Sequence, residues 1–213
     1  MKNSKLKFRH AAGAGFILAL LLTQCIVPYE SARMLPAGAT EVKAAFSHGS
    51  DHYEGESESL SNNFGLGVGY GISDHLNLKV RYERIAVADS DGEGINYLAF
   101  GPKYAIVPDY VAVMMPLGVY FGEGESTWGI HPGLLFTLPA KNQRVEGTFG
   151  VRTDIFFEEG TEMLVGFNIG LGLSQDLERW AIRPDLGFVI NPGEKGSILT
   201  LGVGVSYNIT GRR

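Results

Sequence analysis

Residues 63–72, NFGLGVGYGI, carry a large apolar side chain at every second position from Phe64 and a glycine at each position between. Successive side chains of a β-strand point to opposite faces of the sheet, so this stretch has one bulky apolar face and one almost bare face. A half-buried strand of a soluble sheet normally turns a polar face to water. We therefore predict that the apolar face contacts lipid and that the bare face lines the narrow interior of a barrel.

The same period-two pattern recurs along most of the chain from residue 40. The segments that show it are 40–48, 63–72, 75–85, 96–107, 109–121, 127–138, 145–157, 162–174, 180–191 and 197–209. They match the roughly 9–11 tilted residues that a strand needs to cross a membrane, and their even number is typical of bacterial outer-membrane barrels. We predict an all-β fold over residues 40–213: a closed, antiparallel, up-and-down transmembrane β-barrel of about ten strands. The alternative is a soluble barrel, which would place its apolar residues inside.

The first 24 residues have the composition of a signal peptide. Four basic residues precede the apolar run AAGAGFILALLL at residues 11–22. This run is short for a membrane span and has the length of the apolar region of a secretory signal. We predict that residues 1–24 are a signal peptide, with a retained membrane anchor as the alternative.

Cys25, the single cysteine of the chain, ends the stretch LLTQC, which resembles a bacterial lipobox. The resemblance implies lipid attachment at Cys25, although Gln24 stands where Gly, Ala or Ser is usual. The alternative is a signal peptide in which Cys25 has no role. Residues 25–39 contain two prolines and show no period, so we expect a tether or a short irregular lead-in.

Residues 67–84 read GVGYGISDHLNLKVRYER. This stretch resembles the short-turn hairpin of small bacterial outer-membrane β-barrel proteins of the porin-like or OmpA-like type. The stretches HPGL and IRPDLGF are similar in style to strands of these proteins. The resemblance covers about residues 40–209 and implies location in the outer membrane of a Gram-negative bacterium. Four prolines lie inside expected strands, where each removes a ladder hydrogen bond, so we expect bulges or bends there: Pro102, Pro116, Pro132 and Pro184.

The inward-facing positions carry charges of both signs in nearly equal number. The basic residues are Lys43, Lys79, Arg81, Lys103, Arg152 and Arg183, and the acidic ones are Glu41, Glu83, Glu146, Asp154 and Asp185, with His131 close in character. Buried charges need partners, and a selective channel more often shows a ring of one sign. We predict a largely plugged polar lumen stabilised by ion pairs. A narrow pore for ions or small solutes is the alternative, since inward glycines leave space.

The connections on the predicted outer side are rich in acidic residues. These are Asp51, Glu54, Glu56, Glu58, Asp89, Asp91, Glu93, Glu123, Glu125, Glu158, Glu159, Glu162 and Glu194, with Lys195 as the only base. Such loops are usually just solvated. The functional alternative is a surface for divalent cations or for a cationic partner, in which calcium or magnesium could bridge to lipopolysaccharide. The net charge of −5 argues against a nucleic-acid partner.

We find no strong sign of catalysis, of a metal site or of a cofactor. Ser47, His48, Ser50, Asp51 and His52 gather near the first outer connection, but sequence neighbours in a loop are weak evidence for a catalytic set. We therefore expect no enzyme. The leading prediction is an outer-membrane barrel with a structural or surface-interaction role, with a transport barrel as the second and a rim-site enzyme as the third.

Overall fold

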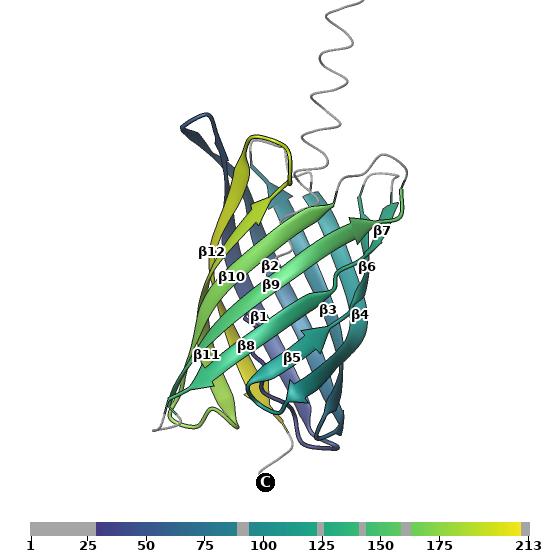
Figure 1. Ribbon diagram of the computed structural model, residues 1–213, viewed down its shortest axis with the longest axis vertical. Helices are drawn as coiled ribbons and strands as arrows, with labels where there is room; N and C mark the ends of the chain where they lie inside the picture. The colour runs from purple at the N-terminus through teal and green to yellow at the C-terminus, as the bar shows by residue number, and fades with distance from the viewer. Residues whose placement is uncertain (1–28, 89–93, 123–125, 141–143, 159–162, 210–213) are drawn as a thin grey trace, which may run out of the picture.

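The computed structural model describes residues 29–88, 94–122, 126–140, 144–158 and 163–209, and these form one closed antiparallel barrel (Figure 1). The strands are β1 (Thr40–Tyr53), β2 (Glu56–Ser73), β3 (Leu76–Val87), β4 (Gly94–Val107), β5 (Val111–Met114), β6 (Leu117–Phe121), β7 (Ser126–Ile130), β8 (Gly133–Pro139), β9 (Val145–Phe156), β10 (Leu164–Leu173), β11 (Trp180–Ile190) and β12 (Ser197–Asn208).

The predicted closed barrel of ten strands is confirmed. The twelve strands make ten crossings of the wall, because two crossings are each split into two short strands. β5 and β6 both pair with β4, and β7 and β8 both pair with β9. The ring closes where β1 pairs with β12, with Ala44 opposite Val205. Closure leaves no free edge in this wall, which is the condition for sheet structure inside a bilayer.

Prolines explain where the two crossings split. β5 stops before Pro116 and β7 stops before Pro132, whereas β4 runs through Pro102 and β11 runs through Pro184. The bends expected at the four prolines therefore occur at two of them. The carbonyl oxygens of Pro102, Pro116 and Pro132 each accept a backbone hydrogen bond from the next crossing, at 2.9–3.2 Å, which holds the wall together across each interruption.

Residues 49–62, which separate the expected segments 40–48 and 63–72, extend both strands instead of forming a loop. β1 and β2 continue as a hairpin closed by Glu54 and Gly55, which have φ of 51° and 92°. A two-residue turn with both φ values positive matches the twist of the flanking strands. In the stretch ESESLS serine alternates with larger residues, which is also a strand pattern.

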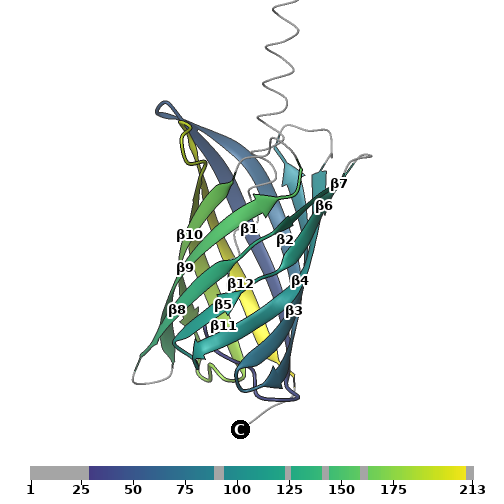
Figure 2. The ribbon, with the colours of Figure 1, turned by 45° about the vertical axis from the view of Figure 1, so that its right-hand side comes forward.

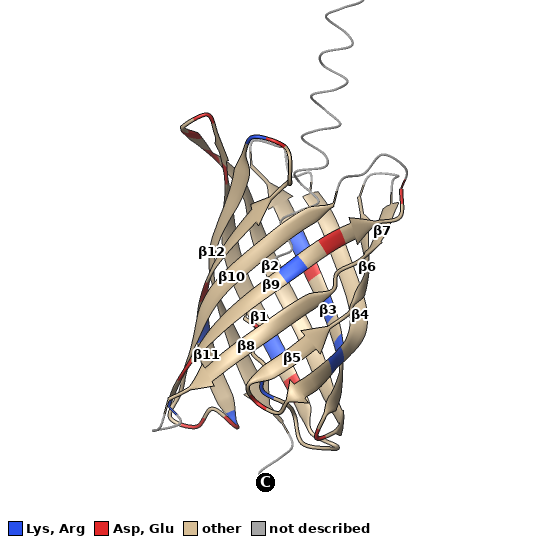
Figure 3. Cartoon of the chain, in the orientation of Figure 1, with Lys and Arg blue, Asp and Glu red and all other residues tan. Residues whose placement is uncertain are grey.

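The outer face of the wall is apolar along most of its length. Leu66, Ile169 and Leu201 are 61%, 62% and 64% exposed, and many other large apolar side chains of the strands are exposed in the same way. Monomeric soluble proteins rarely expose a contiguous apolar surface of this extent. In Figure 3 the strands are mostly tan, with charged residues at the connections and at separated positions within strands. No helix in the described part of the chain is long and apolar enough to span a membrane.

The two ends of the barrel differ in their connections (Figure 2). We call the end with the β1–β2 hairpin and the β11–β12 connection the outer end. The inner end holds the start of β1, the end of β12 and the tight β2–β3 turn at residues 74–75. Longer connections on the outer side and short turns on the periplasmic side are typical of outer-membrane barrels.

Candidate functional site

Residues 29–39, which we call the lumen segment, lie inside the barrel. They contact inward-facing groups on six crossings around the ring: Lys43, Gly71, Lys103, Thr137, Glu146 and Gly202. Only a chain in the interior reaches all of these crossings. A tether or short irregular lead-in is the expectation for residues 25–39. Residues 29–39 have no regular secondary structure and lie in the lumen.

Backbone hydrogen bonds fix the lumen segment along its length. The amide of Ala32 donates to Thr137 Oγ1 at 2.7 Å, and the amide of Met34 donates to Asp109 Oδ1 at 3.0 Å. Nearer the inner end, the amide of Gly38 donates to the carbonyl oxygen of Gly71 at 2.8 Å. These bonds supply the partners that buried backbone groups need.

The inward glycines leave the space that this segment occupies. A Cβ on Gly202 or Gly204 would collide with Tyr29, and a Cβ on Gly71 would collide with the backbone at Pro36. Gly71 of β2 and the glycines of β12 therefore accommodate a second layer of chain. Space left by inward glycines had favoured the pore alternative, and at these three positions residues 29–39 fill it.

Three lysines from β1, β3 and β4 converge on the carboxylate of Glu30, and we call them the lysine cluster. Lys43 of β1, Lys79 of β3 and Lys103 of β4 place Nζ 2.6, 3.5 and 3.7 Å from Glu30. Glu41 of the wall pairs with Lys79 at 2.7 Å and with Lys43 at 3.3 Å. Lys103 also donates to the carbonyl oxygens of Ser31 and Arg33, at 2.9 and 2.5 Å.

A second ionic cluster also joins the lumen segment to the wall. Arg33 donates through Nε to Glu146 Oε2, and Arg183 donates through Nη1 to Glu146 Oε1 at 2.6 Å. Glu146 is fully buried. One wall carboxylate thus holds an arginine of the segment and an arginine of the wall, as expected where buried charges need partners.

The remaining predicted lumen charges pair within the wall. Asp154 lies 2.7 Å from both His131 Nδ1 and Arg152 Nη2, and the His131 ring is surrounded by aromatic rings at 5.5–6.1 Å. Arg81 pairs with Glu83 at 2.5 Å, and Asp185 accepts a 3.0 Å hydrogen bond from the Asn168 amide. The structure places all of the eleven predicted lumen residues in the interior, buried or half-buried: Lys43, Lys79, Arg81, Glu83, Lys103, His131, Glu146, Arg152, Asp154, Arg183 and Asp185.

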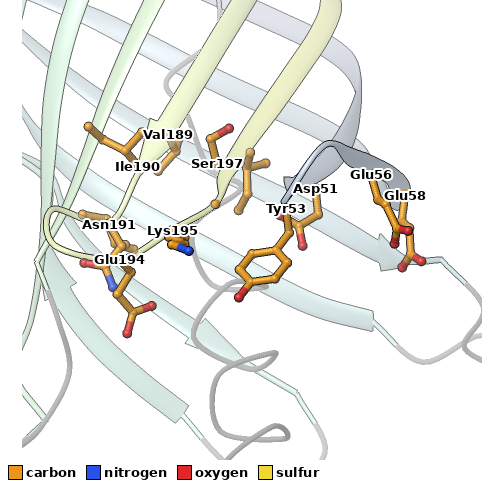
Figure 4. Close-up of a pocket in the computed structure, with 13 residues that line it drawn as sticks. Asp51, Tyr53, Glu56, Glu58, Val189, Ile190, Asn191, Glu194, Lys195 and Ser197 are labelled. Atoms are coloured by element: carbon orange, nitrogen blue, oxygen red, sulfur yellow. The ribbon is translucent and has the colours of Figure 1, made fainter.

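A wide acidic cavity opens at the outer end, and we call it the outer cavity. It has a volume of about 720 Å³ between the β1–β2 hairpin and the β11–β12 connection (Figure 4). Its lining includes the acids Asp51, Glu56, Glu58 and Glu194, the base Lys195, the aromatic Tyr53 and the apolar Leu164, Val189 and Ile198. Four carboxylates against one ammonium give the cavity a negative potential.

Ser47 and His48, two residues near the first outer connection, lie on opposite faces of β1. Ser47 is buried and accepts a hydrogen bond from the Asn63 amide at 3.2 Å. His48 lies next in the strand, so its ring points to the opposite face, where Nδ1 contacts Asn62 Oδ1 at 3.1 Å. In the described part of the chain no group of three or more His, Cys, Asp or Glu side chains is arranged to hold a metal ion.

Several predicted features fall on residues that the structure does not describe. The signal peptide at residues 1–24 and Cys25 lie outside the described residues. So do these acidic residues of the outer connections: Asp89, Asp91, Glu93, Glu123, Glu125, Glu159 and Glu162.

The closed wall and its apolar outer face define the class of protein. A strand structure can span a bilayer only when it closes on itself, and closed barrels with an apolar outer band and a polar interior are the form found in bacterial outer membranes. The chain is a transmembrane β-barrel of the bacterial outer membrane, as predicted.

No protein-family model and no curated protein matches the chain. Solved structures do match it. An outer-membrane channel from Pseudomonas putida F1 has 12% identity and a TM-score of 0.49 over 86% of this chain and 100% of that one. Ail, the attachment invasion locus protein of Yersinia pestis, has 13% identity and a TM-score of 0.39 over 81% and 99%. Neisserial surface protein A has 15% identity and a TM-score of 0.37 over 80% and 98%. The class stated above rests on the wall itself rather than on these matches.

Proposed function

We propose that this protein is a closed outer-membrane barrel that acts at the cell surface through its outer end. The observation that carries the proposal is the lumen segment, which occupies the interior and is held by ion pairs and hydrogen bonds to six crossings of the wall. Two cavities that border it have volumes of only about 60 Å³ each. That volume holds a few water molecules and leaves little room for a solute.

The outer cavity is the surface that this proposal uses. Its carboxylates suit a partner with positive charge, and its apolar floor adds contact area for the body of that partner. The carboxylates do not form a preformed metal cluster within the described residues. A divalent cation bound here would therefore be shared with the phosphate groups of lipopolysaccharide, which supply the oxygen ligands that the protein lacks.

Single-channel conductance of the purified full chain in a planar bilayer tests the closed lumen. Heat-modifiable gel mobility of the same sample shows that the barrel is folded. We expect a folded barrel without discrete current steps. Steps of uniform size would overturn the proposal and support the narrow transport barrel instead.

Binding of the folded protein to lipopolysaccharide vesicles with and without magnesium tests the surface role. We expect magnesium-dependent binding that falls at least several-fold when Asp51, Glu56, Glu58 and Glu194 are replaced by their amides. Replacement of Glu178, which lies near the inner end, by glutamine is the control. Equal binding by all three proteins would remove the outer cavity from the proposal.

A further inference from the structure

We infer that the lysine cluster is an oxyanion-binding site in the lumen and that the carboxylate of Glu30 occupies it in this structure. The ligand class is a small anion with several oxygens, a phosphate or a polycarboxylate. The inference does not depend on the surface role proposed above, since it concerns the inner half of the lumen.

The wall by itself provides more positive than negative charge at this place. Lys43, Lys79 and Lys103 come from β1, β3 and β4, and Glu41 is the wall carboxylate paired with two of them. The hydrogen bonds and ion pair that the structure gives Lys103 all go to residues 29–39. Without the lumen segment, three ammonium groups would face one carboxylate, an arrangement that favours an anion.

Glu30 behaves as an imperfect occupant of this site. Its Oε1 accepts a hydrogen bond from Lys43 at 2.6 Å. Its Oε2 is buried and has no hydrogen-bond partner, although Lys79 and Lys103 lie 3.5 and 3.7 Å away. A buried carboxylate oxygen without a hydrogen bond is unusual and costly. An anion with three or four oxygens could accept bonds from all three lysines at once, which the two oxygens of Glu30 do not.

The Glu30 carboxylate itself takes the place that such an anion would fill, and two small cavities adjoin the cluster. One cavity of about 60 Å³ is lined by Glu30, Lys43 and Lys79. A second cavity of about 60 Å³ is lined by Lys43 and Lys103 and reaches Arg179 at the inner end. The lysines are therefore close to solvent-sized voids, and the second void marks the side from which an anion would arrive.

The test compares the unfolding of full-length variants in different anions. Glu30→Ala removes the carboxylate from the site, and Glu30→Gln keeps the shape of the side chain without its charge. The double variant Glu30→Ala with Lys103→Met also removes one of the three ammonium groups. Each refolded protein is unfolded in urea, with tryptophan fluorescence as the signal, in sodium phosphate, sodium citrate or sodium chloride of equal ionic strength.

In phosphate or citrate we expect the midpoint of Glu30→Ala to rise above its value in chloride, in a saturable and concentration-dependent way. The wild-type protein should show only the smaller, non-saturating rise that excluded salts give any folded protein, and Lys103→Met should reduce the rise of the double variant to that wild-type level. A rise in phosphate alone identifies a phosphate ligand, and a rise in citrate alone identifies a carboxylate.

The inference is overturned if the rise of Glu30→Ala in phosphate and citrate does not exceed that of the wild-type protein, or if the double variant keeps the excess. If Glu30→Ala does not fold in chloride, folding yield in phosphate or citrate replaces the midpoint, and recovery of the barrel supports the site. Failure of both Glu30→Ala and Glu30→Gln to fold in every salt also overturns it, since Glu30 is then a structural group that no anion replaces.

Discussion

Tyr29 donates a hydrogen bond from its phenol to the backbone carbonyl oxygen of Phe46 at 2.9 Å and so joins the lumen segment to β1. The Tyr29 ring lies against Gly202 and Gly204 of β12, the strand that closes the barrel against β1. One side chain thus contacts both sides of the closing seam. The lumen segment is for this reason part of the packed interior.

Gly204→Ala should destabilise the barrel because its Cβ would lie 2.5 Å from Tyr29 Cγ. Forcing extra volume into a packed interior typically costs about 1–3 kcal/mol. Gly65→Ala is the matched control, since it also faces the lumen and its Cβ would lie at an ordinary 3.7 Å from Ala45 Cβ. Urea unfolding of both variants in detergent checks the difference, and equal midpoints would show that Tyr29 is not held against β12.

Thr137→Val should destabilise the protein by about 1–3 kcal/mol, the usual cost of leaving a buried donor unpaired. The buried amide of Ala32 donates to Thr137 Oγ1 at 2.7 Å, and valine cannot accept that bond. Thr127→Val is the control, because the Thr127 hydroxyl bonds to Glu158 at 3.0 Å in an exposed position. A loss at Thr127 as large as that at Thr137 would contradict the assignment.

Glu146→Gln should cost about 3–5 kcal/mol, as removal of one partner from a buried ion pair does. It would leave Arg33 and Arg183 facing each other in the interior without a carboxylate. Glu54→Gln should cost at most about 1 kcal/mol, because the Glu54–Lys195 pair at 3.5 Å is exposed. Chemical unfolding measures both, and similar losses would argue that the lumen is well hydrated around Glu146.

Leu66→Arg tests the lipid-facing surface. Leu66 is 61% exposed on β2, and an arginine on the lipid face of a barrel costs about 2–4 kcal/mol near the bilayer midplane. Leu66→Ile should be close to neutral and serves as the control. Folding yield into lipid vesicles, read from heat-modifiable mobility, should fall for the arginine variant alone; full folding of that variant would contradict a lipid contact at this position.

Much of the wall was predictable because its signal is local. The alternation of Phe64, Leu66 and Val68 predicts an outward apolar face from five residues alone. This prediction does not depend on residues that are distant in the sequence. The positions of the strands follow from the same period. The two-residue turn at Glu54 and Gly55 is not predicted by the sequence, because Glu-Gly is not among the dipeptides that favour such turns.

The sequence predicts which charged residues face the lumen, but it does not predict which of them pair with each other. Period two places Glu146, Arg183 and Asp154 on the inward face, but it does not say which carboxylate meets which base. That choice depends on the register between strands and on the stagger around the closed ring. In the structure Glu146 of β9 reaches Arg183 of β11 across the intervening β10.

The sequence by itself determined a lipid-facing, glycine-lined wall, because the alternation of side chains along a strand is a property of neighbouring residues. Tertiary structure alone decided that residues 29–39 turn back into the lumen. These residues have no period, and their partners lie far along the chain, as with Ala32 and Thr137, which are 105 residues apart. Their position follows from the space beside Gly202 and Gly204 at the β1–β12 seam and from the excess positive charge of the lysine cluster, and both depend on how distant strands are arranged in space.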